Sequence, residues 1–136
     1  MAEVDINYIA VLAASLVGLV VGAVWYGPLF GKPWRLAAGL DPEVIERSPR
    51  SAMRRTFMIS FILNYIMAYC LAMFIGNGQS VGMATLYGFL TGLPWIGFAI
   101  AINAMYEGKS FKYILLNGGY WTVTFTLMGL IIGALQ

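Results

Sequence analysis

Four long apolar stretches without a charged residue limit this chain to a membrane fold. They cover residues 8–26, 57–75, 81–105 and 113–135. A helix needs about 20 apolar residues to cross the hydrocarbon core of a bilayer. Inside that core, backbone N–H and C=O groups must bond within the protein, and a helix satisfies them by itself. We therefore predict an all-α integral membrane protein, a single four-helix transmembrane domain over residues 1–136 that contacts the lipid bilayer.

Two of the stretches carry the same motif. Residues 14–27 read ASLVGLVVGAVWYG and residues 84–97 read ATLYGFLTGLPWIG, so both fit A-x-L-x-G-x-x-x-G-x-x-W-x-G. A weaker match relates the second stretch to the fourth, where a Leu-Asn pair precedes a glycine in each. We predict that the four transmembrane helices form two repeated hairpins, 7–76 and 77–136. Both hairpins have the same orientation, so they should superpose by rotation about an axis near the membrane normal.

Basic residues lie in two of the three connections and predict the topology. The first connection holds Lys32, Arg35, Arg47, Arg50, Arg54 and Arg55, and the third holds Lys109 and Lys112. The second connection, at 76–80, holds no charge. If the helices alternate in direction, all basic side chains lie on one side, and the positive-inside rule makes that side cytoplasmic. We therefore expect both termini on the outer side of the membrane.

The first connection carries helix-start and helix-stop signals. Pro33 and Gly39 bracket one short helix, because proline suits the first turn and glycine the position after the end. Asp41-Pro42 predicts a second helix, with the aspartate as its cap. We expect short interfacial helices between the first two transmembrane helices, with Trp34 at the level of the lipid headgroups. A solvated loop with basic anchors is the alternative.

Small residues recur at intervals of four in the apolar stretches, which places them on one face of each helix. Such residues let helix backbones approach closely inside a bilayer, where hydrophobicity does not pull helices together. We predict helix packing at six glycines that follow this spacing: Gly18, Gly22, Gly88, Gly92, Gly129 and Gly133. The spacing leaves open whether these faces meet within the chain or meet another copy.

A few polar side chains lie within the apolar stretches and form a possible polar cluster: Trp25, Asn64, Trp95, Asn103 and Asn117. An amide in hydrocarbon needs hydrogen-bond partners, and an indole N–H can supply one. These groups either hold helices together or line a small polar pocket. Pro94 removes a backbone hydrogen bond, so it should bend the third helix.

The composition excludes several kinds of chemistry. The chain has no histidine, which removes histidine metal sites and histidine acid–base catalysis. Its one cysteine, Cys70, cannot hold an iron–sulfur cluster. No carboxylate lies inside an apolar stretch, and no nucleic-acid-binding module is present. We expect no catalytic residues, no metal, no cofactor and no nucleic-acid partner.

Several segments together resemble a known family. Residues 22–34, GAVWYGPLFGKPW, resemble the signature G-x-x-W-Y-x-P-L-x-F-G-x-x-W with one residue fewer before Phe30. Residues 103–112, NAMYEGKSFK, and the later segments LNGGY and MGLIIG extend the match over nearly the whole chain. The chain is similar to the small bacterial membrane proteins of domain of unknown function family 1761. This resemblance implies a four-span membrane protein with no established activity, and we expect it in the cell inner (cytoplasmic) membrane.

These observations favour one function and leave another open. The leading hypothesis is a non-enzymatic integral membrane protein that packs as a homo-oligomer or as an accessory subunit with other membrane proteins. The alternative is a transporter or channel for a small or lipophilic solute, because repeated hairpins often build such proteins. A membrane enzyme acting on lipids would need a catalytic constellation that the sequence does not contain.

Overall fold

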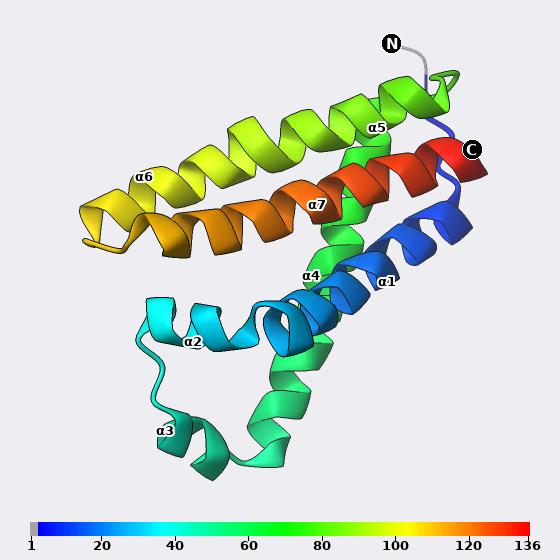
Figure 1. The fold of residues 1–136 in the computed structure, drawn as a ribbon. Helices are drawn as coiled ribbons and strands as arrows, with labels where there is room; N and C mark the ends of the chain where they lie inside the picture. Colours follow the sequence, from blue (N-terminus) through cyan, green and yellow to red (C-terminus); the bar gives the residue numbers. More distant parts are fainter. Residues whose placement is uncertain (1–2) are drawn as a thin grey trace.

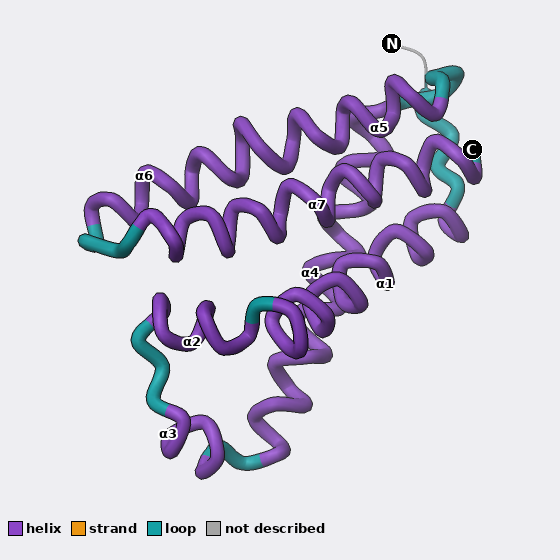
Figure 2. Tube along the Cα trace, in the orientation of Figure 1, coloured by secondary structure: helices purple, strands orange, loops and turns teal. Residues whose placement is uncertain are grey.

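Four helical segments are long and apolar enough to cross a membrane within residues 3–136, the part of the chain that the computed structural model describes. They are Tyr8–Leu29, Arg50–Ile75, Val81–Tyr106 and Phe111–Leu135. This part of the chain contains helices and loops but no strand (Figure 2). The predicted all-helical membrane class is therefore confirmed, while the two-hairpin repeat stays a prediction.

The first and third spans each change geometry near their tryptophan. The first consists of α1 (Tyr8–Val24) and a wider π-helical turn, η1 (Trp25–Leu29). The third consists of α5 (Val81–Leu90), a second π-helical segment, η2 (Thr91–Gly97), and α6 (Phe98–Tyr106). Each π-helical segment contains a proline, which cannot donate the backbone hydrogen bond of a regular helix. The local geometry of the helices thus changes at the shared motif in both spans.

The last span, α7 (Phe111–Leu135), is the central helix. It packs between α1 on one side and α5, η2 and α6 on the other (Figure 1). By contrast, α4 (Arg50–Ile75) crosses the other spans at a steep angle and meets them through its C-terminal half (Figure 1). The buried core lies at this crossing and includes Val11, Ala14, Ala68, Leu71, Ala72, Met128 and Ile132.

The predicted glycines face neighbouring helices. A Cβ on Gly88 would overlap the carbonyl oxygen of Phe125, and one on Gly129 would overlap the carbonyl oxygen of Ala84. A Cβ on Gly92 would lie 2.7 Å from the carbonyl oxygen of Trp121. The glycines of α5, η2 and α7 therefore leave room for backbone atoms of the same chain. Their energetic role as packing positions stays a prediction, which substitution tests.

Two short helices connect α1 to α4. The first, α2 (Gly31–Ala38), ends at Gly39, whose φ of 71° is the left-handed conformation that glycine adopts readily. The second, α3 (Pro42–Arg47), starts with the Asp41 side chain accepting a hydrogen bond from the Glu43 N–H at 2.9 Å. Both helices occur where the helix signals predicted them. Their position at the membrane surface stays a prediction.

The segments that precede α1, join α4 to α5 and follow α7 meet at one end of the molecule (Figure 1). Asp5 and Asn77 exchange two hydrogen bonds, of 2.7 and 3.0 Å. The Asn7 amide donates to the Leu135 carbonyl at 2.7 Å. The connections that hold the basic residues lie toward the opposite end (Figure 1). This separation of charge agrees with spans that alternate in direction.

Candidate functional site

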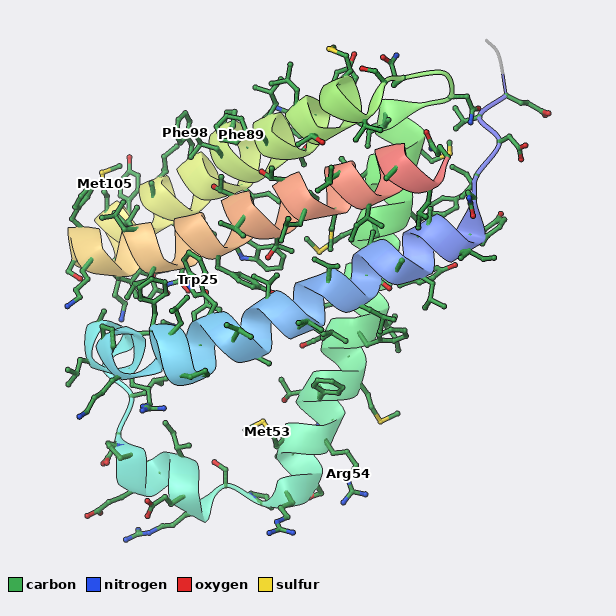
Figure 3. The ribbon with its side chains drawn as sticks, turned by 45° about the vertical axis from the view of Figure 1, so that its right-hand side comes forward. Trp25, Met53, Arg54, Phe89, Phe98 and Met105 are labelled. Atoms are coloured by element: carbon green, nitrogen blue, oxygen red, sulfur yellow. The ribbon has the colours of Figure 1, made fainter. Side chains whose placement is uncertain are left out.

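Polar and aromatic side chains gather between η1 and the first half of α7. The Trp25 indole N–H donates to the backbone carbonyl of Leu116 at 2.9 Å, and the Tyr26 hydroxyl donates to Asn117 Oδ1 at 2.8 Å. Figure 3 shows Trp25 between the end of α1 and α7. Two consecutive residues of η1 thus bind two consecutive residues of α7, which fixes the register between these helices.

Glycines give the two segments room to meet. A Cβ on Gly119 would lie 3.1 Å from Cζ2 of Trp25, so the indole ring lies against bare backbone. On another face of α7, a Cβ on Gly118 would lie 3.7 Å from the Cα of Gly97 in η2. The LNGGY segment therefore contacts the first span and the third span at the same level.

Tyr120 extends the contact deeper into the protein. Its side chain is buried, and its hydroxyl donates to the backbone carbonyl of Gly18 at 2.7 Å. The ring of Tyr26 packs 5.1 Å from the ring of Tyr120 and 4.7 Å from the ring of Trp34, measured between centroids. We call Trp25, Tyr26, Trp34, Asn117 and Tyr120 the aromatic–polar cluster. It attaches α2 to the central helix through Trp34.

The turn after Tyr26 depends on glycine and proline. Gly27 has φ −102° and ψ −106°, outside the helical region, and Pro28 follows it. The turn closes where the Phe30 N–H donates to the Trp25 carbonyl at 2.8 Å. A Cβ on Gly31 would lie 2.6 Å from the Tyr26 carbonyl oxygen, so only glycine fits there without a shift. The signature GPLFG therefore forms the turn that leads from the aromatic–polar cluster into α2.

Asn64 lies apart from this cluster, on α4. Its amide donates to the Ser60 carbonyl one turn earlier at 2.8 Å, as Asn117 does to the Tyr113 carbonyl at 3.0 Å. Asn64 is 5% exposed, and its Oδ1 lies against Gly18 without a hydrogen-bond partner in the described part of the chain. Asn64 and Tyr120 thus approach Gly18 from different helices without bonding to each other.

The other two predicted residues lie elsewhere. Trp95 is 62% exposed and packs against Phe74 of α4, with 5.4 Å between ring centroids. Asn103 is exposed on α6. The structure therefore brings Trp25 and Asn117 together but does not bring Trp95 or Asn103 to them. A pocket formed by all the predicted polar residues stays a prediction.

Sequence reasoning missed the two tyrosines of the aromatic–polar cluster. Tyr26 directly follows Trp25, and Tyr120 lies three positions after Asn117. Their nearness to Trp25 and Asn117 in the sequence could have identified them. A tyrosine in a span carries a hydroxyl that needs an acceptor, and a polar residue nearby can provide one. Both hydroxyls and the Trp25 N–H are already bonded within the chain. The cluster can therefore join helices, but it presents no free acid, base or nucleophile.

A separate groove opens between α4 and η2. It has a volume of about 430 Å³, and Phe125 of α7 also lines it. Its walls are mostly apolar and include Cys70, Phe74, Thr91 and Trp95. The Thr91 hydroxyl bonds the Tyr87 carbonyl of its own helix at 2.8 Å. This groove has the volume and lining to hold a hydrophobic chain within the span of the membrane.

Comparison with known proteins agrees with the motifs described above. The model of a family described as protein of unknown function (DUF1761) matches residues 9–133. No curated protein and no solved structure gives a significant match. Nearly the whole length of the chain, including the residues of the aromatic–polar cluster, lies within the matched range. The chain therefore belongs to the DUF1761 family of proteins of unknown function.

Proposed function

We propose that this protein is a non-enzymatic membrane component that assembles with a second copy of itself through α4. The observation that carries the proposal is the lack of packing around the first half of α4. Phe57, Met58 and Ile59 are 58%, 60% and 48% exposed. Consecutive helix residues point about 100° apart, so the helix is open on every side there and not along one stripe.

Hollows along α4 support contact with another helix. One of about 330 Å³ lies between α4 and α1, where Leu12, Phe61, Ile62 and Tyr65 line it. Another of about 330 Å³ is lined by Arg54, Arg55, Met58 and Ile59 of α4. Helices associate in membranes largely through close van der Waals packing. The residues that line these hollows have room for such packing by another helix. Around a two-fold axis, each α4 would fill the hollows of its partner, and this symmetry is the commonest in oligomers.

Cross-linking tests this assembly in a Cys70→Ala background, because Cys70 is exposed. We expect Ile62→Cys, at a side chain that is 55% exposed on α4, to form disulfide-linked dimers in oxidised membranes. Phe98→Cys is the matched control, because Phe98 is also 55% exposed but points away from α7 on the outer face of α6 (Figure 3). The proposal is refuted if neither variant forms a disulfide-linked dimer and the protein has a monomeric mass in mild detergent.

The groove between α4 and η2 favours a second candidate function, the binding or transport of a lipophilic solute. Trp95 lines the groove, and its N–H has no acceptor among residues 3–136, whereas the Trp25 N–H has one in Leu116. A hydrophobic molecule with a carbonyl group would supply the missing acceptor. Native mass spectrometry separates the two candidate functions. A dimer supports self-assembly, and a bound lipophilic molecule supports solute binding or transport.

We also propose that the protein lies in the inner membrane with both termini outside, since the basic residues are confined to the first and third connections. In the Cys70→Ala background, a reagent that cannot cross the membrane should label Gln79→Cys in intact cells but not Ser48→Cys. Both side chains are exposed, so accessibility does not separate them. The reverse labelling pattern would place the termini inside.

A further inference from the structure

A pocket of about 470 Å³ lies between α2 and α3, outside the features discussed above. Its lining includes two cationic side chains, Lys32 and Arg35, and one carboxylate, Glu46. Leu36, Leu40 and Ile45 supply an apolar surface in the same pocket. The pocket therefore combines charged groups of both signs with a place for hydrocarbon.

The cations of this pocket are available to a ligand. Lys32 and Arg35 lie three residues apart on α2, so they share a face of the helix. Within residues 3–136 the ion pair is Arg47 with Glu43, at 3.7 Å, and it includes neither of them. An ammonium and a guanidinium on one face can bind a phosphate group together. Neither Lys32 nor Arg35 has an ion-pair partner within residues 3–136.

The apolar residues of the pocket are exposed, Leu36 most of all. Leu36 is 81% exposed, Leu40 is 39% exposed and Ile45 is 37% exposed. Contact with hydrocarbon would remove this surface from water, which is favourable in proportion to its area. A ligand with an acyl chain next to its charged group matches this arrangement.

Lipid binding at this pocket rests on the proposed topology, in which the first connection lies at the cytoplasmic surface and the pocket lies near lipid headgroups. α2 starts at Gly31, two residues after the first span ends at Leu29, and α3 ends at Arg47, three residues before α4 starts at Arg50. Trp34 of α2 packs on Tyr26, which belongs to the first span. The short helices are therefore held next to the ends of two spans.

We propose that this pocket binds the headgroup of a glycerophospholipid that carries a primary amine, as phosphatidylethanolamine does. Lys32 and Arg35 bind the phosphodiester, and Glu46 binds the ammonium group. The upper part of an acyl chain lies against Leu36, Leu40 and Ile45. Two cations and one carboxylate match a headgroup with one phosphate and one amine, whereas the glycerol headgroup of phosphatidylglycerol offers the carboxylate hydroxyl donors but no cation.

The first test compares lipid binding by variants that lose equal charge. Native mass spectrometry of the full chain in detergent is titrated with phosphatidylethanolamine and with phosphatidylglycerol of the same acyl chains. We expect the double substitution Lys32→Gln, Arg35→Gln to weaken phosphatidylethanolamine binding by about tenfold or more, since it removes two charge-assisted contacts to the phosphate. Lys109→Gln, Lys112→Gln is the control, because neither cation lines the pocket and both lie where α6 joins α7. Equal loss in both variants would mean general charge attraction and overturn the site.

The second test addresses the carboxylate and the acyl chain. Glu46→Gln should weaken phosphatidylethanolamine binding and strengthen phosphatidylglycerol binding, because it removes an attraction to the amine and a repulsion of the anion. An unchanged ratio between the two lipids would overturn the assignment of Glu46. Two soluble compounds should compete only weakly with phosphatidylethanolamine for the protein. They are glycerophosphoethanolamine, which lacks acyl chains, and inorganic phosphate. Competition as strong as that of the intact lipid would identify a soluble phosphate ligand and overturn the proposal.

Discussion

Replacing Gly88 with alanine is expected to destabilise the protein by about 3 kcal/mol, the upper part of the usual range for overpacking. The added Cβ would overlap the carbonyl oxygen of Phe125 and lie 3.2 Å from the Cα of Gly129. Both atoms belong to the backbone of α7, so neither can rotate away, and α5 must separate from the central helix. Unfolding with SDS in mixed micelles measures the change in free energy of unfolding.

Gly82→Ala is the matched control, because it makes the same change in the same helix. The atom nearest to a Cβ there is Ser80 Oγ, at 4.0 Å, and the residue is exposed. Alanine favours a helix over glycine by about 1 kcal/mol, so Gly82→Ala should be neutral or slightly stabilising. If Gly88→Ala were tolerated as well as Gly82→Ala, α5 and α7 would not meet at this glycine.

The second large effect is expected at Trp25. Trp25→Ala should destabilise the protein by about 3 kcal/mol, because it removes a ring packed on Phe30 and Gly119 and a hydrogen bond to Leu116. The same change at Trp95, its counterpart in the sequence repeat, should cost under about 1 kcal/mol, since that side chain is 62% exposed. Thermal unfolding in one detergent compares the two variants directly.

Trp25→Phe separates the hydrogen bond from the packing. Phenylalanine keeps an aromatic ring but loses the indole N–H, and an interhelical hydrogen bond of this kind contributes about 1 kcal/mol in membranes. We therefore expect Trp25→Phe to destabilise the protein, but by less than Trp25→Ala does. If Trp25→Ala and Trp95→Ala were equally destabilising, the two halves of the repeat would contribute alike, and the asymmetry described here would be wrong.

Local features of this fold could be predicted from sequence because they depend on nearby residues. The spans follow from uninterrupted apolar composition, and the ends of α2 and α3 follow from Gly39, Asp41 and Pro42. The steep crossing of α4 could not be predicted. A crossing angle depends on which helix faces meet, and the spacing of small residues identifies a face without naming its partner. In this fold, Gly88 meets α7 whereas Gly18 lies against Asn64 of α4.

The candidate site was predictable only in part for a related reason. Trp25 and Trp95 occupy equivalent positions in the repeat, and both are predicted for the polar cluster. Their neighbours differ, because Trp25 donates to the Leu116 carbonyl of α7 whereas Trp95 packs on Phe74 of α4. Sequence equivalence places a π-helical segment at the motif in both spans, although Gly27 leaves the helical region and Gly97 does not. It does not specify which helix lies opposite.

The central position of α7 has a consequence for biosynthesis. Of the four spans, α7 is the last to leave the ribosome, yet it is the helix against which α1, α5 and η2 pack. The three earlier spans therefore enter the bilayer before their common neighbour has been made. Until then the Tyr120 hydroxyl that binds Gly18 is absent, and so is the Leu135 carbonyl that accepts from Asn7. Until the final span arrives, the nascent chain can pack its first helix against α4 but not against α7.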